Sequence, residues 1–159
     1  MKEQEHLPEY GVGPVYVAII IIVTLIGILL SAFRIIHVGN AEILRLPFIV
    51  LGIALIIAGI IIFVYAQIDL GDHIRKNKLV TTGIYAYVRN PIYTSFLMVC
   101  TGAVLIANDV WLCILPFLYW LFLTVLMKHT EEKWLHDLYG EQYAAYCRQV
   151  NRCIPWKRK

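Results

Sequence analysis

Two long apolar runs without a charged residue constrain what this chain can fold into more than any other feature. The first spans Val15 to Phe33 and the second spans Leu46 to Ala66, which are 19 and 21 residues. About 20 apolar residues in a helix cross the hydrocarbon core of a bilayer, and a helix satisfies its own backbone groups there. Composition agrees, because 60% of the residues are hydrophobic and 16% are charged, against ~45–50% and ~25% in soluble domains. Both runs therefore predict membrane-spanning helices.

Two shorter apolar runs follow in the second half of the chain. The third spans Ile92 to Ala107 and the fourth spans Val110 to Met127, with Asn108-Asp109 between them. Two apolar runs joined by a two-residue turn predict a helical hairpin. Pro116 lies inside the fourth run and predicts a kink there, because proline interrupts the backbone hydrogen bonds of a helix.

The polar C-terminal part of the chain has apolar residues at helical spacing. Glu131 to Tyr139 and Glu141 to Val150 are separated by Gly140, and each predicts a short amphipathic helix at the membrane interface. The fold class expected is therefore all-α: one polytopic membrane domain over residues 1–159, with four transmembrane helices, the last two a hairpin, followed by C-terminal interfacial helices.

The distribution of lysine and arginine predicts which side of the membrane each loop occupies. With four spans, 12 of the 14 basic residues fall on the side of the two termini and the loop before Ile92, and Arg34 and Arg45 fall on the other. Loops rich in lysine and arginine face the cytoplasm. Both termini and that loop are therefore expected to lie on the cytoplasmic side. Membrane lipids are expected partners of the protein. Nucleic acid is not an expected partner, because no basic run with interleaved aromatic residues lies in a soluble domain.

The stretch from Lys78 to Tyr93 is polar and rich in aromatic residues. Its tyrosines are Tyr85, Tyr87 and Tyr93. They are typical either of an aromatic belt at the membrane interface or of a wall that stacks on a ligand ring. Arg89 is open to two interpretations as well: its side chain reaches lipid headgroups, or it is a fixed cation for a carboxylate or phosphate.

A second polar cluster contains the adjacent acids Glu131 and Glu132. They either favour the start of a helix through its dipole or are paired within a site, since an unpaired carboxylate at a membrane boundary is costly. No G-x-G-x-x-G motif lies between a strand and a helix, so a Rossmann cofactor site is not predicted. The histidines lack the spacing of metal ligands, and no metal site is assigned.

Several short motifs occur in a fixed order over residues 77–155. They are Leu79–Tyr85, Val88–Tyr93, Glu131-Glu132, Leu138–Tyr143 and Ile154-Pro155. This ordered set resembles the superfamily of integral membrane methyltransferases that includes isoprenylcysteine carboxyl methyltransferases and phospholipid methyltransferases. The resemblance covers about half the chain; upstream of it, only the helical character matches.

The resemblance implies transfer of a methyl group from S-adenosylmethionine to a lipophilic small molecule or to a prenylated or lipid-linked acceptor. It implies Arg89 and Glu131 as catalytic residues. By motif position, the cofactor-binding residues would be Asn77, Lys78, Leu79, Val80, Tyr85, Asn90, Pro91, Ile92, Tyr93, Glu131 and Glu132.

Two positions depart from the pattern of the family. Asn90 stands where the family more often has histidine, and asparagine cannot act as a titrating base. Met127 stands where eukaryotic isoprenylcysteine enzymes have an arginine for the substrate carboxylate. The sequence therefore leaves the acceptor open.

Two other functions remain open. One is a membrane reductase that uses NADPH, because sterol reductases are similar in this C-terminal region. The other is a non-catalytic membrane scaffold. Cofactor binding distinguishes the three: a methyltransferase binds S-adenosylhomocysteine, a reductase binds NADPH, and a scaffold binds neither.

Overall fold

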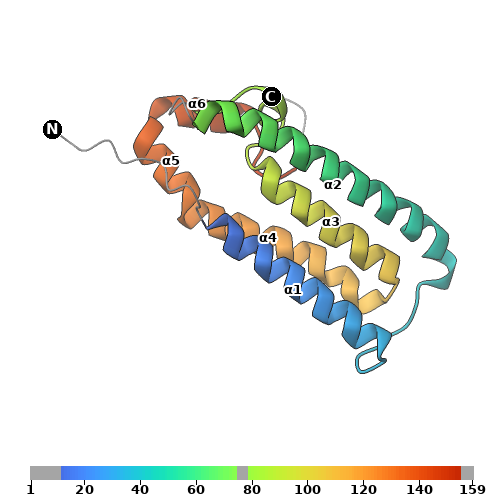
Figure 1. The fold of residues 1–159 in the computed structure, drawn as a ribbon. Helices are drawn as coiled ribbons and strands as arrows, with labels where there is room; N and C mark the ends of the chain where they lie inside the picture. The colour runs from blue at the N-terminus through green and yellow to red at the C-terminus, as the bar shows by residue number, and fades with distance from the viewer. Residues whose placement is uncertain (1–11, 75–78, 155–159) are drawn as a thin grey trace.

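The computed structural model describes residues 12–74 and 79–154, and all regular elements within these ranges are helices (Figure 1). Among the described residues, four longer helices form a bundle, and two short helices lie across one of its ends. The elements are α1 Gly13–Ala32, α2 Arg45–Ile74, α3 Pro91–Ala107, α4 Leu115–His129, α5 Glu131–Tyr139 and α6 Glu141–Gln149, with 3₁₀ turns at Glu42–Leu44, Gly83–Ala86 and Val110–Ile114.

The expected all-α membrane class is confirmed. Within the described residues, three stretches are long and apolar enough to cross a membrane: Gly13–Ala32, Glu42–Leu70 and Val110–Tyr139. Helix α3 has 17 residues, which is shorter than the ~20 that span the hydrocarbon core. The number of four spans therefore stays a prediction.

Two sequence expectations about the helices are wrong. Helix α2 continues to Ile74 instead of ending at Ala66, since no proline interrupts the polar residues that follow and polarity alone does not end a helix. Pro116 does not kink a helix, because α4 begins at Leu115 and the proline lies in its first turn. Proline fits there because the first-turn N–H groups have no partner within the helix.

Helices α2 and α3 are side by side because glycines let their backbones approach. A Cβ atom added to Gly52 would lie 2.7 Å from the carbonyl oxygen of Gly102, and one added to Gly59 would lie 2.7 Å from that of Ser95. Small residues allow this kind of close contact between membrane helices.

The core lies between α1, α3 and α4. Three hydroxyl groups inside it form hydrogen bonds: Tyr119 shares a 2.8 Å hydrogen bond with Thr24, and Tyr16 donates to the Tyr119 carbonyl at 3.3 Å. Paired hydroxyls avoid the cost of burying a polar group without a partner. The buried core residues are Tyr16, Ile20, Cys100, Val104, Leu112, Leu115, Tyr119, Leu123, Met127 and Cys153.

The segment after α6 is attached to the start of α3. Three backbone carbonyls of residues 151–153 accept hydrogen bonds from the Arg89 and Asn90 amides and the Thr94 hydroxyl, at 2.9, 3.1 and 2.8 Å. The side-chain amide of Asn90 donates to the same segment at 3.2 Å. This attachment brings the end of the described chain to the end of the bundle where the predicted site residues lie.

Candidate functional site

A cavity of about 210 Å³ lies where α3 begins and where α5 and α6 cross the end of the bundle. Most of the predicted site residues meet around it: Leu79, Val80, Tyr85, Arg89, Asn90, Pro91, Ile92, Tyr93 and Glu131. Glu132 is not among the lining residues and instead contacts two arginines. The predicted residues Asn77 and Lys78 lie outside the described residues.

The cavity has a second wall that sequence reasoning missed. Leu135 and Tyr139 from α5 and Tyr143 and Tyr146 from α6 line it, together with Leu70 from the extended part of α2. Their spacing of three or four residues was a visible signal, because such residues share one face of a helix. The predicted tyrosine wall is present in part: Tyr85 and Tyr93 line the cavity, whereas Tyr87 is 63% exposed.

Glu131 is held at the cavity wall by donors from two other helices. The Tyr93 hydroxyl donates to its Oε1 at 2.7 Å. The backbone N–H groups of Val12 and Gly13, at the start of α1, also donate to the carboxylate, where the helix dipole stabilises negative charge. A carboxylate has about four acceptor positions. These three donors therefore leave capacity for a ligand in the cavity.

Gly13 is required by this arrangement, and sequence reasoning gave it no role. A Cβ atom at this position would overlap the Tyr93 side chain, with the ring carbon Cζ only 2.6 Å away. Real Cβ atoms do not approach so closely, so only glycine leaves Tyr93 where it meets Glu131. The sequence held no signal for this contact, because the contact depends on how α1 packs against α3.

Tyr85 is positioned by contacts from α2 and α6. Its carbonyl accepts a 2.6 Å hydrogen bond from the Tyr146 hydroxyl, and the neighbouring Ile84 amide donates to Asp69 at 2.8 Å. Gly83 precedes them with φ +59°, close against Asp69, a conformation that glycine adopts without strain. Burial raises the pKa of the Tyr85 and Tyr146 phenols. Both therefore stay neutral at physiological pH.

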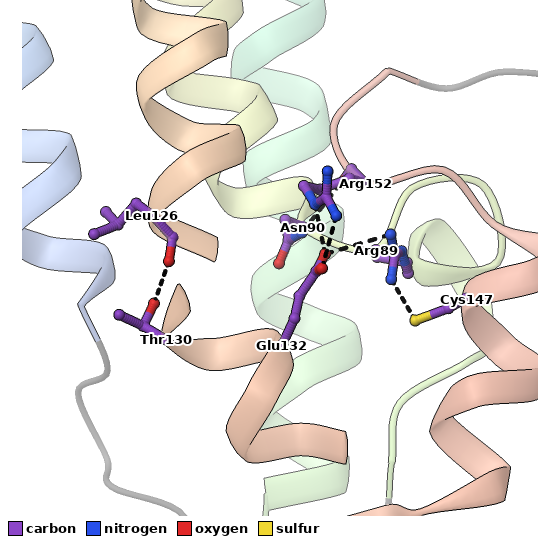
Figure 2. Close-up of polar contacts among 7 residues, drawn as sticks. All are labelled: Arg89, Asn90, Leu126, Thr130, Glu132, Cys147 and Arg152. Carbon is purple, nitrogen blue, oxygen red and sulfur yellow. Dashed lines mark hydrogen bonds and ion pairs between the residues drawn. The ribbon is translucent and has the colours of Figure 1, made fainter. Parts of the chain in front are cut away.

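Beside the cavity, one glutamate holds two arginines (Figure 2). Arg152 donates to both carboxylate oxygens of Glu132, at 2.6 and 2.7 Å, and Arg89 lies 3.3 Å from Oε1. Arg89 also donates to the Cys147 sulfur. The Arg89 side chain is 9% exposed. It is therefore held in an ion pair rather than extended toward lipid headgroups.

The cavity suits a ligand that has a positive centre and an apolar or aromatic ring. Glu131 supplies an anion in partly buried surroundings, where electrostatic attraction is stronger than in water, and the tyrosines supply flat apolar walls. Among the described lining residues, the titratable groups are Glu131, Arg89 and tyrosines. Neither histidine nor cysteine is among them. Chemistry here would depend on binding and orientation more than on a protein nucleophile.

Comparisons with known proteins identify similar proteins that are named as methyltransferases. A protein-S-isoprenylcysteine O-methyltransferase from Schizosaccharomyces pombe is 36% identical over 85 residues, which cover 51% of this chain and 36% of the relative. A second such enzyme, from Arabidopsis thaliana, is 30% identical over 115 residues, covering 66% of this chain and 58% of the relative. Methanethiol S-methyltransferase 1 from Bradyrhizobium diazoefficiens is 30% identical over 89 residues, covering 55% and 30%.

The chain thus spans between about a third and three fifths of the length of these relatives. No solved structure matches it. The model of one family, described as phospholipid methyltransferase, matches residues 42–142, which is more than half of the chain and includes α2 to α5. The chain therefore belongs to the phospholipid methyltransferase family.

Proposed function

We propose that this protein is an integral membrane methyltransferase that uses S-adenosylmethionine and acts on a lipophilic acceptor. The observation that supports this most is the placement of Glu131, Tyr93 and Tyr85 around one cavity, although Tyr93 and Glu131 are 38 residues apart. The relatives, which are named as O- and S-methyltransferases, agree with it.

The residues present fit this cofactor. S-adenosylmethionine supplies a methyl group on a positively charged sulfonium and leaves as the neutral thioether S-adenosylhomocysteine. Glu131 would hold its positively charged part, because it is an anion with a free acceptor position. Tyr85 and Tyr93 would hold the adenine ring between apolar faces.

The chain contributes orientation and exclusion of water. The Tyr93 hydroxyl and the start of α1 fix Glu131 before any ligand arrives, and fixed groups do not reorganise during the reaction. Orienting two reactants can lower a barrier by ~7–11 kcal/mol. The tyrosines and leucines of the wall keep water from the transferred methyl group. An acceptor atom that is already nucleophilic would need no base from the protein.

We infer the sidedness of the site from charge. The cavity lies at the same end of the bundle as α5 and α6. Five of the seven basic residues that the structure describes belong to segments at this end, which would face the cytoplasm: Arg89, Lys128, Lys133, Arg148 and Arg152. A soluble cofactor would then enter from the cytoplasm, and a lipophilic acceptor would enter from the bilayer.

The proposal is tested by binding and by transfer. Purified protein in detergent should bind S-adenosylhomocysteine and not NADPH in isothermal titration. Incubation with native membrane lipids, lipidated peptides and methyl-labelled cofactor should then label a lipophilic product. Binding of NADPH alone would indicate a reductase, and binding of neither ligand would indicate a scaffold.

A further inference from the structure

Asn90 occupies the position just before α3, where an asparagine side chain usually accepts a hydrogen bond from an amide of the first helical turn. In this protein the side chain of Asn90 makes no such bond. Pro91 follows it and has no N–H to donate. An asparagine without its usual local bond is a candidate for a tertiary or ligand contact, because departures from local preference concentrate at functional sites.

The segment after α6 decides how the Asn90 amide is turned. Its Nδ2 donates to the backbone carbonyl of Arg152 at 3.2 Å. Only the NH₂ end of an amide can donate to a carbonyl, whereas the oxygen end can only accept. The reverse orientation would place two acceptor oxygens against each other. The end of the amide that is turned away from Arg152 is therefore Oδ1.

The oxygen end of Asn90 is available to a ligand. Asn90 lines the cavity together with Tyr93 and Glu131. Within residues 12–74 and 79–154, the Asn90 side chain forms the hydrogen bond to Arg152 and no other. Both lone pairs of Oδ1 can therefore accept from an N–H or O–H group in the cavity. A carboxylate or carbonyl oxygen of a ligand would be repelled at the same place.

Ionisable groups surround Asn90, but its own amide does not titrate. Figure 2 shows Asn90 beside Arg89, Arg152 and Glu132. Glu131 and the tyrosines of α3, α5, α6 and the turn before α3 share the cavity with it. An amide keeps one donor end and one acceptor end at every physiological pH. An imidazole at this position would change its charge near pH ~6.5.

We propose that Asn90 selects the ligand of this cavity through a permanent hydrogen-bond acceptor: the segment after α6 holds the NH₂ end of its amide, and Oδ1 accepts from an amino or hydroxyl group of the ligand. The contact therefore persists over the physiological pH range. This inference rests on the proposed methyltransferase function and specifies how the cofactor is recognised. S-adenosylmethionine has such donors on its adenine, ribose and amino-acid parts.

The first test is Asn90→Leu, which removes both ends of the amide at similar size. The fold should be retained, because the Arg152 carbonyl keeps the bond from the backbone amide of residue 90 at 3.1 Å and Thr94 keeps its bond to the same segment at 2.8 Å. Isothermal titration should show that S-adenosylhomocysteine binds about threefold to tenfold more weakly, the loss expected for one neutral hydrogen bond. Thermal unfolding should change little.

The second test is Asn90→His, which introduces the residue that the family more often has at this position. A neutral imidazole also has one donor and one acceptor nitrogen, and protonation turns the acceptor into a donor. The affinity for S-adenosylhomocysteine, divided by that of the unmodified protein at the same pH, should be close to one at about pH 8.5 and about tenfold lower at about pH 5.5. This ratio cancels the titration of groups that both proteins contain, such as Glu131.

The matched control is Asn151→His. Asn151 is exposed on the segment that holds Asn90 and is not among the residues that line the cavity. An imidazole there should leave the affinity ratio the same at both pH values. Equal pH effects in the two histidine variants would overturn the proposal, because they would show that a charge near the cavity is sufficient.

Two further results would overturn the role of Asn90: unchanged affinity in Asn90→Leu, or a pH-independent ratio in Asn90→His. Either result, together with S-adenosylhomocysteine binding by the unmodified protein, would remove this role and leave the cofactor site in place. Absence of S-adenosylhomocysteine binding by the unmodified protein at both pH values would instead remove the methyltransferase function, and this inference with it.

Discussion

Asp109 at one end of the bundle and Glu131 at the other are both carboxylates held by hydrogen bonds, but their surroundings differ. Asp109 is 1% exposed and accepts from Ser31 at 2.6 Å and from His37 at 2.8 Å. It ties the loop after α1 to the turn before α4. Glu131 is half-buried and lines a cavity. The first arrangement holds loops together, and the second leaves an anion accessible to a ligand.

The same contrast applies to the side chains that surround the carboxylates at the two ends. At the cavity end, Arg89 and Arg152 both contact Glu132, and their side chains are 9% and 20% exposed. At the far end, Asp109 contacts His37 at 2.8 Å, and the His37 side chain is 26% exposed. Substitutions at the two ends should therefore separate stability from ligand binding.

The largest effect is expected for Glu132→Ala. It leaves two largely buried arginines without their shared partner, and breaking a buried pair costs ~3–5 kcal/mol. Thermal unfolding in detergent should show a large drop in stability. Glu141→Ala is the control, because Glu141 is 91% exposed and its pair with Arg148 is at 3.8 Å, and exposed pairs contribute ~0–1 kcal/mol. Similar losses in the two variants would contradict the assigned burial.

Asp109→Asn should follow, with a loss of ~1.5–3 kcal/mol, the usual range for hydrogen bonds to a charged group. Burial opposes ionisation of Asp109, but the hydrogen bonds from Ser31 and His37 outweigh it and lower the pKa of Asp109 below its ordinary value of 3.8. The stabilisation is therefore complete above pH 3.8 and is lost as pH falls through the folded-state pKa.

Unfolding measured against pH checks this sign. The unmodified protein should lose stability below about pH 4, and Asp109→Asn should lose less over the same interval. Affinity for S-adenosylhomocysteine should not change in this variant, because the substitution is at the far end. Weaker cofactor binding would mean that the two ends are coupled.

Gly13→Ala tests the end where α1 meets the cavity. The added methyl group overlaps Tyr93, and overpacking costs ~1–3 kcal/mol. Displacement of Tyr93 should also weaken S-adenosylhomocysteine binding about tenfold, the loss expected for one hydrogen bond to a charged group. In a Tyr93→Leu background the overlap is relieved, so Gly13→Ala should have little further effect on stability. An equal loss in both backgrounds would show that another contact of Gly13 is responsible.

The smallest effect is expected for Tyr146→Phe. It removes the hydrogen bond to the Tyr85 carbonyl at 2.6 Å, and a neutral hydrogen bond contributes ~0.5–1.5 kcal/mol. Tyr65→Phe is the control, because Tyr65 is 58% exposed on α2. Thermal unfolding should separate the two variants. If they unfold alike, the Tyr146 contact does not hold the aromatic wall.

Local pattern was sufficient to predict most of the helices. The apolar run from Val15 to Phe33 and the stripe in Glu131–Tyr139 match α1 and α5 within two residues at each end. The prediction from the run at Leu46 was wrong at its C-terminal end, because the helix continues to Ile74 through polar residues that no proline interrupts. The kink predicted at Pro116 was wrong because this proline lies in the first turn of α4 and not in its interior. The apolar pattern placed the start of the helix at Val110, five residues before its observed start at Leu115.

The candidate site was predictable where ordered motifs existed and not elsewhere. Tyr85, Tyr93 and Glu131 were identified together from the family resemblance, and they line one cavity. Arg152 and Gly13 were not identified, because their roles come from contacts with residues far along the chain: Arg152 with Glu132, and Gly13 with Tyr93. No short sequence pattern records such a contact.

Isothermal titration of S-adenosylhomocysteine into the unmodified protein, Glu131→Gln and Asp109→Asn is the most direct test of the difference between the two ends. Both substitutions neutralise a hydrogen-bonded carboxylate, so they are matched in chemistry. We expect Glu131→Gln to weaken binding at least tenfold, consistent with ~1.5–3 kcal/mol for an interaction with a charged group, and Asp109→Asn to bind as the unmodified protein does. Unchanged affinity in folded Glu131→Gln would contradict the assignment of this cavity as the cofactor site.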